Sequence, residues 1–228
     1  MTVAETEIFE PDGRAVPYAD DHGDGPALVL LPGAGLRLGY LGLLAEALGE
    51  EDFRVVRIGC RRPNDAVPAP TLHDLAQDVV DVMDHVGMTR PWVGGHGFGG
   101  TVARTVALNH PARAAGVLLL AVEGEAPVEV SPTSEIPENA YDRERMALQR
   151  AARAASAEIG AATLAPGIPV LALQGSADRV MPPANGETLR AAAPERVSLV
   201  TIDGAADLFP LTHVGETAWP IEDYLDWD

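Results

Sequence analysis

The segment GGHGFGG, residues 94–100, contains the residues whose types and spacing are most specific for chemistry. Written as G-x-G-x-x-G, with Gly95, Gly97 and Gly100, it matches a dinucleotide-binding fingerprint, and Glu123 stands near the spacing of a ribose-binding acid. Such fingerprints usually lie in the first βαβ unit, whereas two other expected strands precede this segment. The dinucleotide interpretation predicts a nicotinamide-dependent oxidoreductase. It is the weaker of the two interpretations that this segment allows.

The second interpretation is a sharp strand-to-helix turn of the form G-x-S-x-G. Such a turn needs small residues two before and two after its centre, because larger side chains would collide there. Gly95 and Gly99 meet this requirement. The central position is Gly97, which has no atom that can attack a carbonyl. This interpretation explains more of the segment and is the one we favour.

The elements around this turn alternate between short apolar segments and helical patterns. This alternation predicts an α/β fold with a mostly parallel central sheet flanked by helices. Apolar residues recur at helical spacing from Leu72 to Val86, with Thr71 and Asp74 as a capping box and Gly87 as a stop. The expected buried strands are 27–31, 53–58, 91–95, 116–122, 168–174 and 197–203.

Residues 123–165 interrupt this alternation. They are polar and rich in proline, and then helical from about Glu138. An insertion between two core strands that cannot itself be a buried strand is typical of a small cap or lid. We therefore expect an α/β core formed by residues 1–122 and 166–228, with a small helical cap between the two parts.

Composition excludes several classes of function. The net charge of −18 disfavours nucleic acid and anionic membranes as partners. All sixteen basic residues are arginine, which excludes a lysine Schiff base, a pyridoxal phosphate enzyme and a Walker A loop. The single Cys60 excludes an intrachain disulfide, and the first residues show no signal-peptide pattern, so we expect a cytoplasmic protein.

Five segments, taken in order, resemble the α/β-hydrolase superfamily. The first, VPYADDHGDGPALVLLPGAG, resembles its opening hairpin, first buried strand and oxyanion loop. The other four are FRVVRIGCRRPNDAVPAPTLHDLAQDVVDVMDHVG, GGHGFGGTVARTVALNHPARAAGVLLL, GIPVLALQGSADRVMPP and VTIDGAADLFPLTHVGE. The resemblance covers most of the chain. It implies the hydrolase fold and makes GGHGFGG the nucleophile elbow.

The resemblance also assigns roles to single positions, and two members of the Ser-His-Asp triad are missing. Gly97 stands at the nucleophile position and Asp207 at the histidine position, whereas the acid position, Asp178, is intact. The backbone amides of Phe98 and Ala34 correspond to the oxyanion donors. Serine-hydrolase chemistry is therefore not expected, because aspartate cannot act as base and then acid without a strongly raised pKa.

The leading hypothesis is an enzyme that uses acid–base chemistry without a covalent intermediate. Asp207 would transfer a proton and Asp178 would tune the pKa of Asp207, since two neighbouring carboxylates in a cleft resist double ionisation. Cyclisation, elimination, isomerisation or hydration of a mostly apolar small molecule fits this pair of carboxylates, and we expect the reaction to belong to secondary metabolism. We expect no metal and no cofactor, and further pocket candidates are Cys60, Glu123 and His96.

The alternative is a catalytically inactive hydrolase homologue that acts as a ligand-binding or regulatory protein. The space left by the missing side chain at Gly97 distinguishes the two hypotheses. A water or substrate oxygen held there by Asp207 would favour the enzyme, whereas a space filled by protein side chains would favour the binding protein. The sequence leaves the substrate, the reaction and the oligomeric state open.

Overall fold

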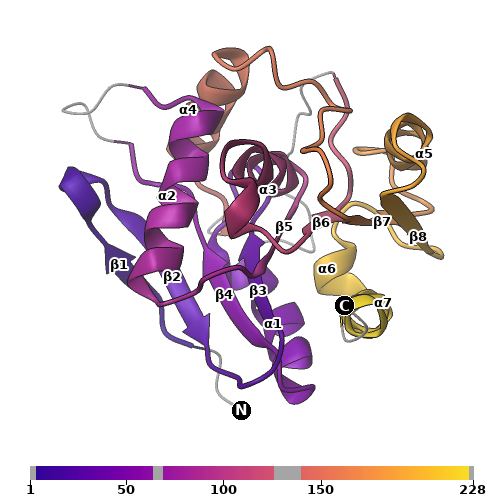
Figure 1. Ribbon diagram of the computed structural model, residues 1–228, viewed down its shortest axis with the longest axis horizontal. Coiled ribbons are helices and arrows are strands. Elements are labelled where there is room, and N and C mark those ends of the chain that lie inside the picture. Colours follow the sequence, from indigo (N-terminus) through magenta and orange to yellow (C-terminus); the bar gives the residue numbers. More distant parts are fainter. Residues whose placement is uncertain (1–3, 64–68, 126–139, 226–228) are drawn as a thin grey trace.

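The computed structural model of the chain describes residues 4–63, 69–125 and 140–225 (Figure 1). An eight-stranded sheet with the order β1-β2-β4-β3-β5-β6-β7-β8 forms its centre. The strands are β1 (Glu7–Phe9), β2 (Val16–Asp21), β3 (Ala27–Leu31), β4 (Arg54–Ile58), β5 (Trp92–His96), β6 (Val117–Leu120), β7 (Val170–Gly175) and β8 (Val197–Ile202).

The sheet is parallel from β4 to β8 and antiparallel at the edge formed by β1 and β2. This confirms the predicted α/β fold, and all six expected strands are present with ends that shift by at most two residues. The opening hairpin consists of β1 and β2, and β2 pairs with β4 instead of with β3. Residues that follow β3, β5, β6 and β7 therefore meet at one edge of the sheet.

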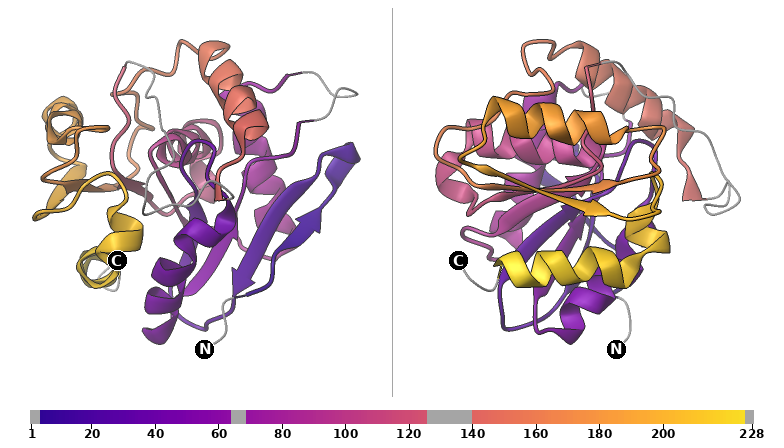
Figure 2. Two further views of the ribbon diagram at one scale, coloured as in Figure 1. Left: turned by 180° about the vertical axis from the view of Figure 1, so that it is seen from behind. Right: turned by 90° about the vertical axis from the view of Figure 1, so that its right-hand side faces the viewer.

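Helices cover both faces of the sheet. In the right-hand view of Figure 2, α3 and α5 lie above the sheet, and α1 and α7 lie below it. In β3, Leu28 and Leu30 join the core on the side of α1, α6 and α7, whereas Val29 and Leu31 join the core on the side of α2 and α3. The helices are α1 (Gly42–Glu50), α2 (Leu72–His85), α3 (Phe98–Asn109), α4 (Arg143–Ala154), α5 (Pro183–Ala192), α6 (Phe209–Thr212) and α7 (Val214–Leu225).

Both ends of α2 follow the sequence signals. The Thr71 hydroxyl accepts a hydrogen bond from the Asp74 amide at 3.2 Å, and the Asp74 carboxylate accepts one from the Thr71 amide at 2.8 Å. Gly87, just beyond the helix, has a φ of +73°, which favours glycine. The predicted capping box and stop signal are therefore confirmed.

The helix expected from about Glu138 begins later, at Arg143. Tyr141 is extended and forms an isolated bridge with Leu36, so the chain is not yet helical there. The Asp142 carboxylate then accepts a hydrogen bond from the Arg145 amide at 3.0 Å and caps the helix. Glu138 itself lies outside the described residues.

In the described part of the chain, no helix has the length and apolar character needed to cross a membrane.

Candidate functional site

The segment that the sequence marks as the elbow lies between β5 and α3. At its centre Gly97 has a φ of +50° and a ψ of −111°. A Cβ atom on Gly95 would collide with the backbone of Gly99, and one on Gly99 would collide with the Leu31 carbonyl group. Both flanking glycines are therefore required by the close approach of β3, β5 and α3.

The space expected beside Gly97 is not empty. A Cβ atom on Gly97 would lie 2.9 Å from Cε and 3.0 Å from Sδ of Met181. Met181 is 3% exposed, and its amide donates a hydrogen bond to the Asp178 carboxylate at 2.8 Å. Its thioether thus occupies the position in front of the elbow, which the sequence could not reveal because Met181 follows a different strand.

The two predicted oxyanion donors belong to two segments, since Phe98 begins α3 and Ala34 follows β3. The Phe98 amide is the first of α3 and has no partner within the helix. Neither this amide nor that of Ala34 has a hydrogen-bond acceptor among the described residues. Next to Ala34, the Gly35 amide donates to Gln149 Oε1 at 2.7 Å, which attaches this loop to α4.

The two predicted catalytic aspartates belong to a buried cluster with His96. The His96 Nε2 atom lies 2.9 Å from the Asp207 carbonyl oxygen and 3.3 Å from Asp207 Oδ1. Asp178 Oδ1 accepts hydrogen bonds from the amides of Val180 and Met181, both at 2.8 Å. Asp178 Oδ2 has no hydrogen-bond partner among the residues described.

Burial and charge both perturb this cluster. Burial raises the pKa of Asp178, and the charge of Asp207 adds to the rise. For His96, burial favours the neutral ring, but the Asp207 carboxylate outweighs burial and raises the pKa. Burial and the charge of Asp207 also raise the pKa of Tyr141. Asp178, Asp207 and His96 are therefore electrostatically coupled, as neighbouring buried groups are expected to be.

A cavity of about 410 Å³ lies between the elbow and α4. Its volume lies within the usual range for sites that bind small molecules. On the core side it is lined by Ala34, Phe98, Glu123, Gly124 and Glu125. On the side of α4 and the residues after it, it is lined by Gln149, Arg150, Arg153, Ala154 and Ala157.

The cavity thus brings together three of the predicted site residues, Ala34, Phe98 and Glu123. Asp178 and Asp207 are not part of its described lining, and they are only 3% and 7% exposed. In the described part of the chain, no group of three or more His, Cys, Asp or Glu side chains is arranged to hold a metal ion.

The order of strands agrees with a match to a protein-family model. Residues 26–145, more than half of the chain, match the model of the alpha/beta hydrolase fold family. The chain belongs to this family.

Solved structures of other proteins have the same fold. Epoxide hydrolase VrEH1 from Vigna radiata superimposes with a TM-score of 0.79 at 14% identity, and the match covers 99% of each chain. A hydrolase from Pseudomonas aeruginosa superimposes with a TM-score of 0.77 at 21% identity, covering 98% of this chain and 99% of the other. At such low identity, the likeness concerns the fold alone.

A curated relative matches over a short segment. The putative carbamate hydrolase RutD of Caulobacter segnis is 49% identical over 47 residues, which are 20% of this chain and 18% of the relative. The matched segment therefore spans less than a fifth of the length of that protein.

Cys60, another predicted pocket residue, does not line the large cavity but a small space next to it, and Phe98 and Gln149 line both. This small space has a volume of about 30 Å³, which has room for about one water molecule. Burial raises the pKa of its thiol to about 12, although the charge of Arg145 acts in the opposite direction. A thiol with this pKa is a poor nucleophile at neutral pH, because the thiolate is the reactive form.

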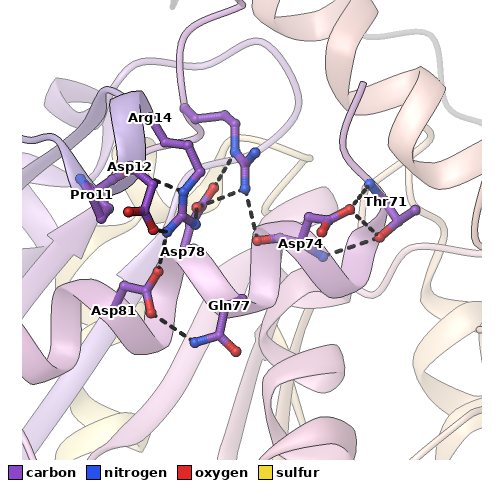
Figure 3. Close-up of polar contacts among 9 residues, drawn as sticks. Pro11, Asp12, Arg14, Thr71, Asp74, Gln77, Asp78 and Asp81 are labelled. Carbon is purple, nitrogen blue, oxygen red and sulfur yellow. Dashed lines mark hydrogen bonds and ion pairs between the residues drawn. The ribbon is translucent and has the colours of Figure 1, made fainter. Parts of the chain in front are cut away.

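The neighbourhood of Cys60 contains a network of ion pairs that braces α2 (Figure 3). Asp78 on α2 accepts hydrogen bonds from Arg14 Nη1 at 2.5 Å, Arg61 Nε at 2.5 Å and Arg61 Nη2 at 2.8 Å. Arg14 also bonds Asp81 at 2.7 Å. Burial raises the pKa of Asp78 despite its two arginine partners. The network ties the N-terminal segment and the segment after β4 to one helix.

The sequence interpretation missed the polar side chains that α4 contributes to the cavity. Gln149, Arg150 and Arg153 fall within the expected cap, and none of them was selected as a site residue. The available signal was the spacing of the two arginines, because residues three apart lie on the same face of a helix.

Proposed function

We propose that this chain is a small-molecule-binding member of the alpha/beta hydrolase fold family that performs no nucleophilic hydrolysis. The observation that carries the proposal is the contact between Met181 and the elbow. The Met181 thioether fills the position where a side chain on Gly97 would project. Without a nucleophile at its centre, the elbow supports no acyl-enzyme.

The buried aspartates support the same proposal. In a Ser-His-Asp triad the acid accepts a hydrogen bond from the histidine that serves the nucleophile. Here Asp178 Oδ2 has no partner among the described residues, and the Asp207 carboxylate lies beside His96 and is not part of the described cavity lining. Asp178 therefore retains the acid position without the histidine that it would orient.

Binding is supported by the cavity between the elbow and α4. It has the volume of a small-molecule site, a few apolar residues and several polar groups that converge on it. Two of these groups are the amides of Ala34 and Phe98, which have no acceptor among the described residues. A ligand oxygen would satisfy both.

A second candidate function is the acid–base enzyme in which Asp207 and Asp178 move a proton. The raised pKa of Asp178, caused first by burial and then by the charge of Asp207, favours it, because acid–base catalysis needs a carboxyl group that holds its proton more tightly than usual. Against it stand the burial of both aspartates and their absence from the described cavity lining. A ligand recovered chemically unchanged after incubation with the protein, as seen by mass spectrometry, favours binding; a new product favours this enzyme.

Incubation with 4-nitrophenyl butyrate tests the loss of hydrolase chemistry. We expect 4-nitrophenol release no faster than in buffer, and no mass increase of the intact protein. The same measurement on Cys60→Ser identifies any acyl group that forms on the thiol. Steady turnover that persists in Cys60→Ser would contradict the proposal.

A further inference from the structure

We propose that the ligand of this cavity is a small organic carboxylate, and that Arg150 on α4 supplies the charge that selects it. This inference rests on the proposed function, because it names the class of molecule that the cavity binds. It follows from the donors that line the cavity, from the pairing of its charged groups and from their positions.

The amides of Ala34 and Phe98 provide the first two donors. Phe98 is the first residue of α3, a helix of 12 residues, and the N-terminus of a helix favours negative charge. Neither amide has an acceptor among the described residues. The elbow end of the cavity therefore offers hydrogen-bond donors to a ligand oxygen.

Gln149 gives an independent indication of the same polarity. Its side chain is 2% exposed and lines the cavity, and its Oε1 is occupied by the Gly35 amide at 2.7 Å. Only the amide nitrogen, a donor, remains for a ligand, and it has no acceptor in the described part of the chain. An anionic or carbonyl oxygen of a ligand can accept a hydrogen bond from this nitrogen.

The two arginines of the lining differ in their pairing. Arg153 Nη1 donates to the Ile159 carbonyl oxygen at 2.8 Å, and its Nε lies 3.9 Å from Glu123 Oε2. Glu123 Oε2 also accepts a hydrogen bond from the Thr101 hydroxyl at 2.6 Å. Arg150 has no ion-pair partner among the described residues. It is therefore the unpaired cation of the cavity, in a chain with a net charge of −18.

The remaining acidic residue of the lining does not cancel this charge. Glu125 is exposed, and its carboxylate accepts a hydrogen bond from the Ala161 amide at 2.7 Å. Arg150 is exposed as well, so solvent screens both charges, but the Glu125 carboxylate already accepts a hydrogen bond whereas Arg150 has no ion-pair partner among the described residues.

The positions of these groups place the ligand's charge near the elbow. Gln149 bonds Gly35, the residue after Ala34, and Arg150 follows Gln149 on α4. Arg153 lies almost one turn further along α4, where it approaches Glu123. The carboxylate would thus lie at the elbow end, and the apolar part of the ligand would lie along Ala154 and Ala157, which also line the cavity.

Calorimetric titration with 4-phenylbutyrate and its neutral amide, 4-phenylbutanamide, tests the inference at pH 7.5. We expect the acid to bind at least about fivefold more tightly than the amide, as one modest ion pair provides. In Arg150→Gln the affinity for the acid should fall about fivefold, while that for the amide stays the same. Arg143→Gln is the matched control, because Arg143 is exposed on the same helix but is not part of the described cavity lining.

Equal affinity for the acid and the amide, equal losses in Arg150→Gln and Arg143→Gln, or no binding of the acid would overturn the inference. The proposed function fails in a different experiment. Ester turnover in the 4-nitrophenyl butyrate assay would contradict it and leave the preference for carboxylates standing. The two failures are therefore distinguishable.

Discussion

The substitution Gly97→Ser restores the usual residue of a nucleophile elbow, and we expect it to destabilise this protein. Gly97 has a φ of +50°, where a residue with a side chain is strained by about 1–3 kcal/mol. The new Cβ atom would also lie 2.9 Å from Met181 Cε, so the Met181 side chain must move. A loss of about 2 kcal/mol would lower the melting temperature of a chain of this size by about 4–8 °C.

A double-mutant cycle separates the strain at Gly97 from its collision with Met181. The free energy of unfolding is measured by urea denaturation for wild type, Gly97→Ser, Met181→Ala and the double variant. Removing the thioether removes the collision, so Gly97→Ser should cost about 1 kcal/mol less in the Met181→Ala background. Met181→Ala alone should cost about 2–5 kcal/mol, because it leaves a cavity.

Gly87→Ser is the matched control for this cycle. Gly87 also has a positive φ, +73°, but a Cβ atom there would meet nothing within 4 Å. Its substitution should therefore cost strain energy alone, and the same amount with or without Met181. If Gly97→Ser costs equally much in both backgrounds, Met181 does not fill the elbow and the reasoning is refuted.

Three further predictions concern groups away from the elbow. Asp78→Ala should lower the free energy of unfolding in urea by about 3–5 kcal/mol, because it leaves the buried Arg61 without its carboxylate and removes one carboxylate partner of the half-buried Arg14. Asp81→Ala, at a more exposed carboxylate, should cost about 1 kcal/mol or less. Cys60, with a pKa of about 12, should react with a disulfide reagent at pH 8 far more slowly than it does in urea, and equal rates would contradict its burial. The hydrogen bond to Glu158 raises the pKa of His73. This pair should therefore stabilise the protein below about pH 6 and lose its effect as the pH rises through the raised pKa. If the difference in free energy of unfolding between wild type and Glu158→Gln grows at high pH instead, this prediction is wrong.

Much of the fold was predictable because its signals are local. The apolar segment 27–31 matches β3, and the capping box at Thr71 marks the start of α2. The glycines flanking Gly97 also predicted the elbow, since their need for close backbone approach follows from spacing alone. Patterns of this kind depend on neighbours in the sequence, and those neighbours remain neighbours in the structure.

The contents of the site depend on contacts between distant segments and were predicted less well. Met181 reaches Gly97 from the turn after β7, and no sequence pattern links the two. The Asp207 side chain lies beside His96, so its position in the sequence did not indicate whether it faces the cavity. The polar lining from α4 depends on how this helix packs over the elbow, which is fixed by the hydrogen bond between Gln149 and Gly35.

The most direct test of the binding account is an NMR titration of the ¹⁵N-labelled protein with 4-phenylbutyrate. The account predicts saturable shifts of the Ala34 and Phe98 amide protons with a single Kd, because both residues line the cavity and their amides have no acceptor among the described residues. The amide of Gly87, which is not part of the described cavity lining, should not shift. Saturable shifts elsewhere, with Ala34 and Phe98 unchanged, would contradict the account.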